Sequence, residues 1–495
     1  MARSSKTADA VVCGAGIAGV AAAWSLVTQG GLRNVTLVEA GEPLSLTSDK
    51  STECYRNWWP GPDDATTRLT NRSIDMMETL ARESGNRIGL NRRGYLFATA
   101  DLDRASTMIA EARTSCRLGA GSLRVHGVDG TSSPQRGAFT SSPLRGALTS
   151  SPQRDASTTT PYVANSEAEI DGNANATFAP SLDGADALLD PDLIRQHFPY
   201  LNPGTVAVLH VRRAGFLSAQ QLGMLMLERS RERGVRLQRG EVEAVHTSGG
   251  RVNGVTVATP QGRVRMDTPA FINAAGPYAH PVAKLAGVDL PVFNERHCKL
   301  TFDDTHGAVA RDAPLLIWCD RVTLPFNDEE REILAEDASA RRLLEPFPAG
   351  VHARPLGRGR SVMLYWTYHN QPEPVEFPVK TDAWMPEILL RGMSVMIPAL
   401  GRYFERLPRP RVDGGYYAKT ADNRPLIGPV PVEGAYVTCA FSGYGIMTAC
   451  AAGELLQAHV TGGALPPYAN AFLPARFDDP AYLERVSAAP SSGQI

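Results

Sequence analysis

The chain has 495 residues, of which 43% are hydrophobic and 21% are charged, and its formal net charge is −2 at pH 7. This length exceeds what one simple core supports, so it predicts two domains or one elaborate α/β unit. A nearly neutral chain lacks the overall basic character that nucleic acid or an acidic membrane attracts, which argues against both as main partners.

Seven cysteines are dispersed along the chain without a CxxC pair or a spacing typical of a metal site. This pattern predicts reduced, mostly structural thiols in the cytoplasm and no bound metal. The first residues, "MARSSKTADAVVCGAG", lack the apolar stretch of a signal peptide, and nowhere do about 18 apolar residues run together. We therefore expect a cytoplasmic protein without a transmembrane segment.

The N-terminal region carries a nucleotide-binding pattern. An apolar run at 10–13 predicts a strand of a parallel sheet, and Gly14, Gly16 and Gly19 follow it as G-x-G-x-x-G before an alanine-rich helical segment. A second apolar run ends at Glu39, twenty positions after Gly19. The glycines permit a tight turn, close approach to a pyrophosphate and helix–strand packing, while the acid accepts hydrogen bonds from ribose hydroxyls. These residues predict a dinucleotide site but do not choose between FAD and NAD.

A repetitive segment follows in the middle of the chain. Residues 131–157 hold three copies of a nine-residue unit, "TSSPQRGAF TSSPLRGAL TSSPQRDAS". Such a composition buries too little apolar surface to offset the entropy lost on ordering. We expect 127–185 to form a flexible surface insertion, with docking of its arginines on an acidic partner as the alternative.

The sequence from about 291 to 410 predicts strands separated by polar, proline-rich loops. Before it, an amphipathic helix at 218–234 leads into a β-meander and then an apolar strand that ends at Ala274-Ala275-Gly276. The segment "RSVMLYWTYHN" at 360–370 alternates, with Tyr365 and His369 on one face of a strand. We interpret it as a half-buried strand of an antiparallel sheet, or alternatively as an aromatic wall of a substrate pocket.

Several short sequence motifs, taken in their order along the chain, make it resemble a known group of enzymes. It resembles the FAD-dependent amine oxidoreductases of the D-amino-acid oxidase, glycine oxidase, sarcosine oxidase and dimethylglycine dehydrogenase family. The late pair "KTADNRPLIG" (419–428) and "FSGYGIM" (441–447) separates this family from NAD-linked enzymes. The remaining phrases that carry the resemblance are "VVCGAGIAGVAAAWSL", "RRGYLFAT", "FPYL", "GEVEAV" and "FINAAGPYA".

The resemblance covers nearly the whole chain apart from the repeats and implies a fold. That fold is α/β, with an FAD-binding Rossmann-like domain and an α+β substrate domain built on a mixed or antiparallel sheet. We expect a discontinuous FAD-binding domain, a substrate domain and the insertion. Their expected bounds are 1–90, 200–290 and 411–475 for the first, 91–126, 186–199 and 291–410 for the second, and 127–185 for the third.

The resemblance also implies the residues that bind FAD. The first glycines and Glu39 hold the ADP half, Val242 meets adenine, Gly276 lies near the pyrophosphate, and the late glycine turn lies against the flavin. The position of a cysteine that links covalently to flavin in some relatives holds Tyr416, Tyr417 and Ala418 here, so we expect non-covalent FAD. The implied cofactor-binding residues are Gly14, Gly16, Gly19, Glu39, Val242, Gly276, Gly443, Tyr444, Gly445, Ile446 and Met447.

Substrate contacts are implied at fewer positions. Relatives bind the substrate carboxylate with an arginine a little beyond the ribose acid, which corresponds here to Arg56, with Lys50 as the weaker candidate. Tyr365, His369 and Tyr444 are candidates to orient the amine or the carboxylate.

Three positions depart from the sarcosine-oxidase-like pattern. Tyr444 and Met447 replace a histidine and a carboxylate-binding lysine, and Met363 stands where a lysine speeds the reaction with oxygen. These departures argue against a simple small amino acid as substrate and against efficient use of oxygen.

The resemblance implies an FAD-dependent oxidoreductase that oxidises the C–N bond of an amine or N-substituted amino acid by hydride transfer to flavin. Its electron acceptor is O2 or another carrier, and its oligomeric state stays open. Oxidation of a hydroxy acid or other C–OH substrate on the same fold is one alternative. A non-catalytic flavoprotein whose repeat segment contacts other proteins is another.

Overall fold

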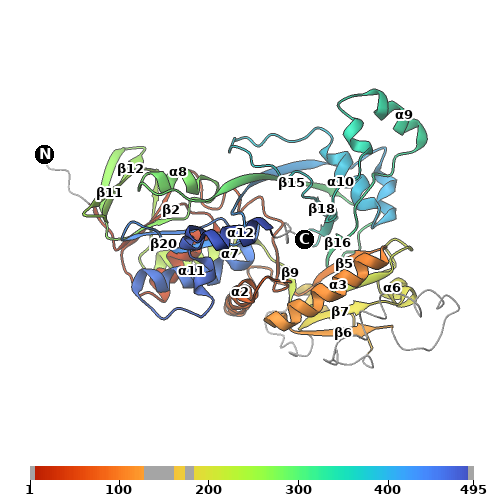
Figure 1. Cartoon of the computed structure of the whole chain (residues 1–495), viewed down its shortest axis with the longest axis horizontal. Coiled ribbons are helices and arrows are strands. Elements are labelled where there is room, and N and C mark those ends of the chain that lie inside the picture. The colour runs from red at the N-terminus through yellow and green to blue at the C-terminus, as the bar shows by residue number, and fades with distance from the viewer. Residues whose placement is uncertain (1–5, 128–160, 173–182, 489–495) are drawn as a thin grey trace.

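The computed structural model describes residues 6–127, 161–172 and 183–488. Two large sheets with their covering helices lie side by side along the long axis of the molecule (Figure 1). The six-stranded sheet lies on the left of the figure, with α7 (Ala219–Glu232) and α11 (Gly445–Thr461) beside it. The nine-stranded sheet lies on the right with α3 (Leu102–Ser115), α6 (Pro191–His197) and α10 (Met385–Ser394). This mixed α/β arrangement confirms the expected fold class.

The six-stranded sheet has the order β10-β3-β2-β14-β21-β20. Its first five strands are parallel and β20 runs antiparallel to β21. The inner strands are apolar and buried on both faces, as expected for a parallel sheet covered by helices. The strands are β10 (Arg236–Arg239), β3 (Val35–Glu39), β2 (Ala10–Cys13), β14 (Phe271–Asn273), β21 (Ala435–Cys439) and β20 (Leu426–Pro429).

Two helices that follow strands of this sheet pack closely against each other. They are α1 (Ile17–Thr28) and α11 (Gly445–Thr461), and both are rich in alanine and glycine where they meet. A Cβ atom added at Gly453 would lie 2.5 Å from the carbonyl oxygen of Ala21, so only glycine allows the two backbones to approach this far. The helices α2 (Ala65–Glu83) and α7 (Ala219–Glu232) complete this apolar core.

The predicted β-meander is confirmed as part of a four-stranded sheet of order β1-β13-β12-β11. A separate two-stranded ribbon pairs β4 with β9 and carries Arg56 at its end. These strands are β1 (Lys6–Thr7), β13 (Gly262–Asp267), β12 (Arg251–Thr259), β11 (Glu241–Ser248), β4 (Cys54–Arg56) and β9 (Ala214–Phe216).

The nine-stranded sheet has the order β19-β15-β18-β17-β16-β5-β8-β7-β6. It is mixed: β5 and β16 are parallel neighbours, as are β6 and β7, while the other pairs are antiparallel. Its strands are β19 (Arg411–Lys419), β15 (Phe293–Asp303), β18 (Ser361–Tyr365), β17 (His352–Pro355), β16 (Leu315–Trp318), β5 (Tyr95–Thr99), β8 (Ala207–Val211), β7 (Gly184–Leu188) and β6 (Ser122–His126).

The remaining helical segments are short. The α-helices are α3 (Leu102–Ser115), α5 (Glu167–Asp171), α6 (Pro191–His197), α8 (Ala279–Lys284), α9 (Asp328–Glu336), α10 (Met385–Ser394) and α12 (Pro480–Ala488). The π and 3-10 segments are η1 (Cys116–Ala120), η4 (Gly276–Tyr278), η5 (Arg341–Leu344), η6 (Pro398–Tyr403), η7 (Ala469–Phe472) and η8 (Pro474–Asp478).

Some strands belong to a different sheet from the one that the expected domain bounds implied. Strands β8 and β19 belong to the nine-stranded sheet, although 200–290 and 411–475 were expected with the FAD-binding part. The expected half-buried strand at 360–370 is also shorter than predicted. Strand β18 ends at Tyr365, and 362–366 is buried on both faces because helices and loops cover the sheet there.

Only part of the expected insertion falls within the described residues. The repeats at 131–157 lie outside them. Within 161–172 the chain forms α5, which begins with a capping box between Ser166 and Glu169, and Glu169 is buried. This part of the expected insertion lies mostly at the surface, and the buried carboxylate of Glu169 attaches it to the sheet.

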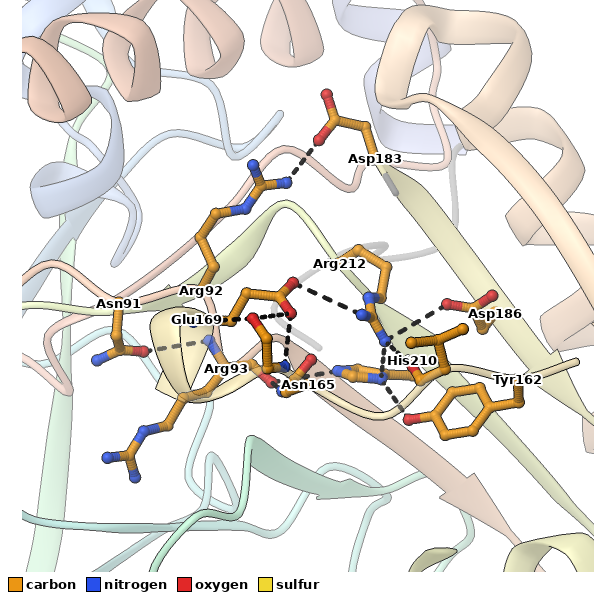
Figure 2. A network of polar contacts seen from close by, with 12 residues as sticks. Asn91, Arg92, Arg93, Tyr162, Asn165, Glu169, Asp183, Asp186, His210 and Arg212 are labelled. Atoms are coloured by element: carbon orange, nitrogen blue, oxygen red, sulfur yellow. Dashed lines mark hydrogen bonds and ion pairs between the residues drawn. The ribbon is translucent and has the colours of Figure 1, made fainter. Parts of the chain in front are cut away.

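The carboxylate of Glu169 belongs to a buried polar network centred on Arg212 (Figure 2). Arg212 is 1% exposed, and its guanidinium lies 3.5 Å from Glu169 and 3.7 Å from Asp186 of β7. It also donates to the carbonyl of Val163 at 3.0 Å and to Nδ1 of His210 at 3.2 Å. Burial, together with the charge of Arg212, lowers the pKa of His210 to about 3, so the ring is neutral and Nδ1 accepts. The network ties 161–172 to β7 and β8.

None of the helices in 6–127, 161–172 and 183–488 combines the length and the apolar character that crossing a membrane requires.

Replacing Arg212 by alanine is expected to destabilise the protein strongly. The change leaves Glu169 and Asp186 with less positive charge around them inside the protein, and breaking a buried pair costs about 3–5 kcal/mol. The measurement is the free energy of unfolding from urea titration of the purified variant. The control is Arg251→Ala, which removes an exposed pair with Glu433 and should cost about 1 kcal/mol or less. Equal losses in the two variants would contradict the structural role of the network.

Candidate functional site

A cavity of about 1120 Å³ opens at the carboxyl ends of β2, β3 and β14, between the N-termini of α1 and α11. Its wall is built from the turn after β2, the end of β3, the start of β11 and the segments 274–278, 416–418 and 440–446. Parallel strands present their carboxyl ends at one edge of the sheet, and ligands of such folds bind there.

The turn between β2 and α1 leaves bare backbone at the cavity. Gly14 has a φ of +103°, and a Cβ atom there would lie 2.5 Å from the carbonyl oxygen of Ala274. Gly16 is the N-cap of α1 without a side-chain cap, and the first turn of the helix holds no acidic residue. Ser48 accepts the N–H of Ile17 at 2.9 Å. Gly19 lies behind the turn, where a Cβ atom would overlap the carbonyl of Gly14. An uncapped helix N-terminus of this kind fits a pyrophosphate.

Glu39 at the end of β3 is held in a defined orientation beside this turn. Its Oε2 accepts the backbone N–H of Ala15 at 2.8 Å, and its Oε1 accepts the N–H of Gly41 at 2.9 Å. Each carboxylate oxygen keeps a further lone pair toward the cavity, which suits the hydroxyls of a ribose. Val242 of β11 and Gly276 also line the cavity.

The other end of the cavity is formed by the start of α11. Gly443 has a φ of +90°, and a Cβ atom there would lie 2.6 Å from the ring of Tyr417. Tyr444 is the N-cap without a side-chain cap, no acidic residue stands in the first turn, and Gly445 and Ile446 line the cavity. A second helix N-terminus with its partial positive charge thus faces the same cavity. This fits the expected flavin end, and the whole wall fits an extended dinucleotide.

Two expected cofactor contacts turn away from the cavity. Met447 is buried in the apolar core of the first domain. The ring of Tyr444 meets that of Trp59 edge-on at 4.5 Å between centroids, outside the cavity wall. The side chain of Tyr444 therefore belongs to a neighbouring polar and aromatic cluster, while Gly443 and Gly445 on either side of it line the cavity.

Arg56 lies in this cluster as a buried cation. Its side chain is enclosed by the rings of Trp59, Tyr95 and Phe97, at 4.6, 5.6 and 5.9 Å from the guanidinium carbon. It is 4% exposed, its Nε has no hydrogen-bond partner, and no carboxylate of the described residues pairs with it. Burial lowers the pKa of Arg56, which means that its charge is costly without an anion. The site is therefore suited to an anionic group of a ligand.

Tyr365, at the end of β18, lies near the cluster around Arg56. Its hydroxyl lies 2.6 Å from Nδ1 of His297, and its ring lies 4.6 Å from that of His352. Burial lowers the pKa of His352 to about 4, with the charge of Arg56 adding to the effect, and the same charge opposes the burial that raises the pKa of Tyr444. Arg56, Tyr365 and Tyr444 thus form one cluster.

Two other candidates lie outside this cluster. His369 is exposed, lies beyond the end of β18 and stands 3.6 Å from Asp382. Lys50 is engaged by Asp49 at 2.8 Å and by Asp413 at 3.2 Å. The structure brings neither of them to Arg56.

Sequence reasoning missed several polar residues on β15 and β19. Glu295, His297 and Lys299 recur at every second position of β15, an alternation visible in "FNERHCKL". The ammonium of Lys299 donates to the carbonyl of Ser51 on the cavity wall at 2.9 Å, and burial lowers the pKa of Lys299. Met363, which the resemblance aligned with a lysine of some relatives, is buried.

Solved structures of similar fold cover nearly the whole chain. L-proline dehydrogenase from P. horikoshii has a TM-score of 0.67 at 18% identity, over 96% of this chain and 98% of that one. Iminodiacetate oxidase from Chelativorans sp. BNC1 has a TM-score of 0.62 at 17% identity, over 94% and 98%. Glycine oxidase from Geobacillus kaustophilus has a TM-score of 0.64 at 14% identity, over 93% and 96%. At sequence identities this low, the similarity shows a shared fold and nothing more.

No curated protein sequence matches the chain. The family model described as FAD dependent oxidoreductase, DAO, matches residues 9–458. That match includes both helix N-termini of the cavity, Glu39 and the cluster around Arg56, and it decides between FAD and NAD. Since it spans most of the chain, the protein belongs to the DAO family of FAD-dependent oxidoreductases.

Proposed function

We propose that the protein oxidises the C–N bond of an amino acid or N-substituted amino acid. The observation that carries this proposal is Arg56, a buried guanidinium near the flavin end of the cavity with which no carboxylate in residues 6–127, 161–172 and 183–488 pairs. A substrate carboxylate would supply the missing charge through paired hydrogen bonds. The similar structures named above are those of enzymes named for proline, iminodiacetate and glycine, each of which joins an amine to a carboxylate.

The residues around Arg56 would position the substrate. The rings of Trp59 and Tyr444 close one side of the guanidinium and exclude water, which strengthens an ion pair formed there. Bound FAD supplies the redox chemistry by accepting two electrons from the substrate. The start of α11 would stabilise negative charge at the flavin edge through its free N–H groups and its dipole.

We expect FAD to be held without a covalent bond. Among the described residues that line the cavity, the one cysteine is Cys13, the last residue of β2, at the nucleotide end. Burial raises the pKa of Cys13 to about 12, so it stands as an unreactive thiol. At the flavin end, Tyr416, Tyr417 and Ala418 form the wall.

The electron acceptor is O2 or another carrier. Methionine at 363 and 447 removes two ammonium groups that related oxidases carry, which favours another carrier, while Lys299 brings one ammonium to the cavity wall at Ser51. We place the protein in the cytoplasm, because all seven cysteines are free thiols in the described structure.

Anaerobic mixing of the purified flavoprotein with a panel of amines and hydroxy acids tests the reaction. We expect at least one amino acid or N-substituted amino acid to bleach the visible absorption of the flavin, and hydroxy acids to leave it unchanged. Admitting air afterwards should restore the colour slowly if another carrier is the natural acceptor. Bleaching by a hydroxy acid alone would replace the proposal by C–OH oxidation, and no bleaching by any compound would favour a non-catalytic flavoprotein.

Replacing Arg56 by methionine is expected to weaken binding of the carboxylate-bearing substrate about 10- to 100-fold, the value of hydrogen bonds to a charged group. The dissociation constant is measured from the substrate dependence of flavin bleaching. The methyl ester of the same substrate should lose little affinity in the variant, because it carries no carboxylate. Arg68→Met, which removes an exposed pair with Asp64, is the matched control. Equal losses for acid and ester would refute the carboxylate contact.

A further inference from the structure

Four buried polar side chains form a continuous line behind the substrate cluster. The ammonium of Lys419 lies 2.8 Å from Oε2 of Glu295, and the same oxygen lies 3.3 Å from Nε2 of His297. Nδ1 of His297 lies 2.6 Å from the hydroxyl of Tyr365. All four side chains are less than one-tenth exposed. The line therefore runs through protein interior from one edge of the nine-stranded sheet to the substrate cluster.

The register of three neighbouring strands builds this line. Glu295 and His297 are two residues apart on β15, so they share one face of the sheet. Antiparallel β19 places Tyr417 opposite Glu295, which leaves Lys419 diagonal to it, and β18 ends at Tyr365, opposite Lys299. The ring of His297 stacks on that of Tyr417 at 4.0 Å, next to the cavity wall.

The contacts fix where the protons lie. Burial alone would raise the pKa of Glu295, but hydrogen bonds from His297 and Lys419 outweigh it and hold the pKa below its ordinary value, so the carboxylate is ionised. Burial lowers the pKa of His297, so the ring is neutral. A neutral ring beside a carboxylate carries its proton on Nε2, which leaves Nδ1 to accept the hydroxyl of Tyr365. Thr367 donates to the oxygen of Tyr365 at 3.2 Å.

The titratable groups packed around the line are less suited than His297 to accept a proton. His352 of β17 faces the ring of Tyr365, and its burial lowers its pKa to about 4. Tyr417 of β19 has a pKa raised to about 12 by burial, and burial also raises the pKa of Tyr444. Arg56 is the cation on the substrate side. His297 differs from His352 in that its ring is hydrogen-bonded to a carboxylate, which opposes the effect of burial on its pKa.

We infer that Tyr365, His297 and Glu295 form a relay that removes a proton from the ammonium group of the substrate. This rests on the proposed function, because an amine gives up electrons only after it has lost that proton. The N–H bond of the ammonium breaks and its proton passes to the oxygen of Tyr365, while the hydroxyl proton of Tyr365 passes to Nδ1 of His297. The amine keeps the electron pair, Glu295 stabilises the imidazolium, and Lys419 keeps Glu295 ionised.

Burial of the substrate assists this transfer. A water-excluded site disfavours the charged ammonium and lowers its pKa toward that of the histidine. Tyr365 acts as the group that touches the substrate, whereas His297 and Glu295 act through it. Their variants should therefore change the pH dependence of the reaction more than the affinity for the substrate.

The test is the rate constant of anaerobic flavin reduction at saturating substrate, measured against pH in Tyr365→Phe and Glu295→Gln. Both changes keep the size of the side chain. We expect the rate constant at pH 7 to fall about 100-fold, a typical contribution of general-base catalysis, and to approach the wild-type value above the pKa of the substrate amine. His246→Asn, on β11 and bonded to Thr256, is the control histidine and should keep the wild-type profile.

A second readout does not depend on turnover. Nitrogen NMR of histidine-labelled protein should show His297 protonated on Nε2 in the wild type, and a loss of that preference in Glu295→Gln. A rate loss of the same factor at every pH would overturn the relay while leaving amine oxidation intact. Failure of every amine to reduce the wild-type flavin would overturn the proposed function and the relay together.

Discussion

The contact between α1 and α11 is the constraint on which the rest of the site depends. Both helices follow parallel strands of the six-stranded sheet, and small residues along both let their backbones approach to the limit that Gly453 sets against Ala21. Because the helices start at the same edge of the sheet, their uncapped N-termini open into one cavity. One packing contact therefore sets the distance between the pyrophosphate end and the flavin end of the FAD site.

The nine-stranded sheet borders the same cavity. Strand β19 brings the ring of Tyr417 onto the bare backbone of Gly443, and its neighbours β15 and β18 carry the buried charges that stand behind it. Arg56 arrives from the opposite side on the β4–β9 ribbon. The reacting part of a substrate would lie where these elements meet, between a cation that attracts a carboxylate and a polar line that ends in a hydroxyl.

Local patterns predicted the turns and strand ends that line the cavity better than the polar residues of the nine-stranded sheet. Gly14, Gly16 and Glu39 act within one β-α-β unit, so their spacing along the chain already determines their geometry. Arg56 was found through resemblance, and the structure adds that none of the described carboxylates pairs with it, which no spacing along the chain can show. His369 was misplaced because the strand that carries it ends at Tyr365. The line from Lys419 to Tyr365 joins strands far apart in sequence, and only their register brings these residues together.

The connection between β6 and β7 has a consequence for the integrity of the molecule. The two strands are parallel neighbours, and Arg212 holds residues 161–172, which lie between them in the sequence, against the sheet. The residues before this connection supply β2 and β3 to one large sheet and β5 and β6 to the other, and the residues after it complete both. Neither the part of the chain before this connection nor the part after it forms a complete hydrophobic core by itself. A cut between β6 and β7 would leave two fragments joined by the hydrogen bonds of two sheets, so the two parts of the chain depend on each other for their fold.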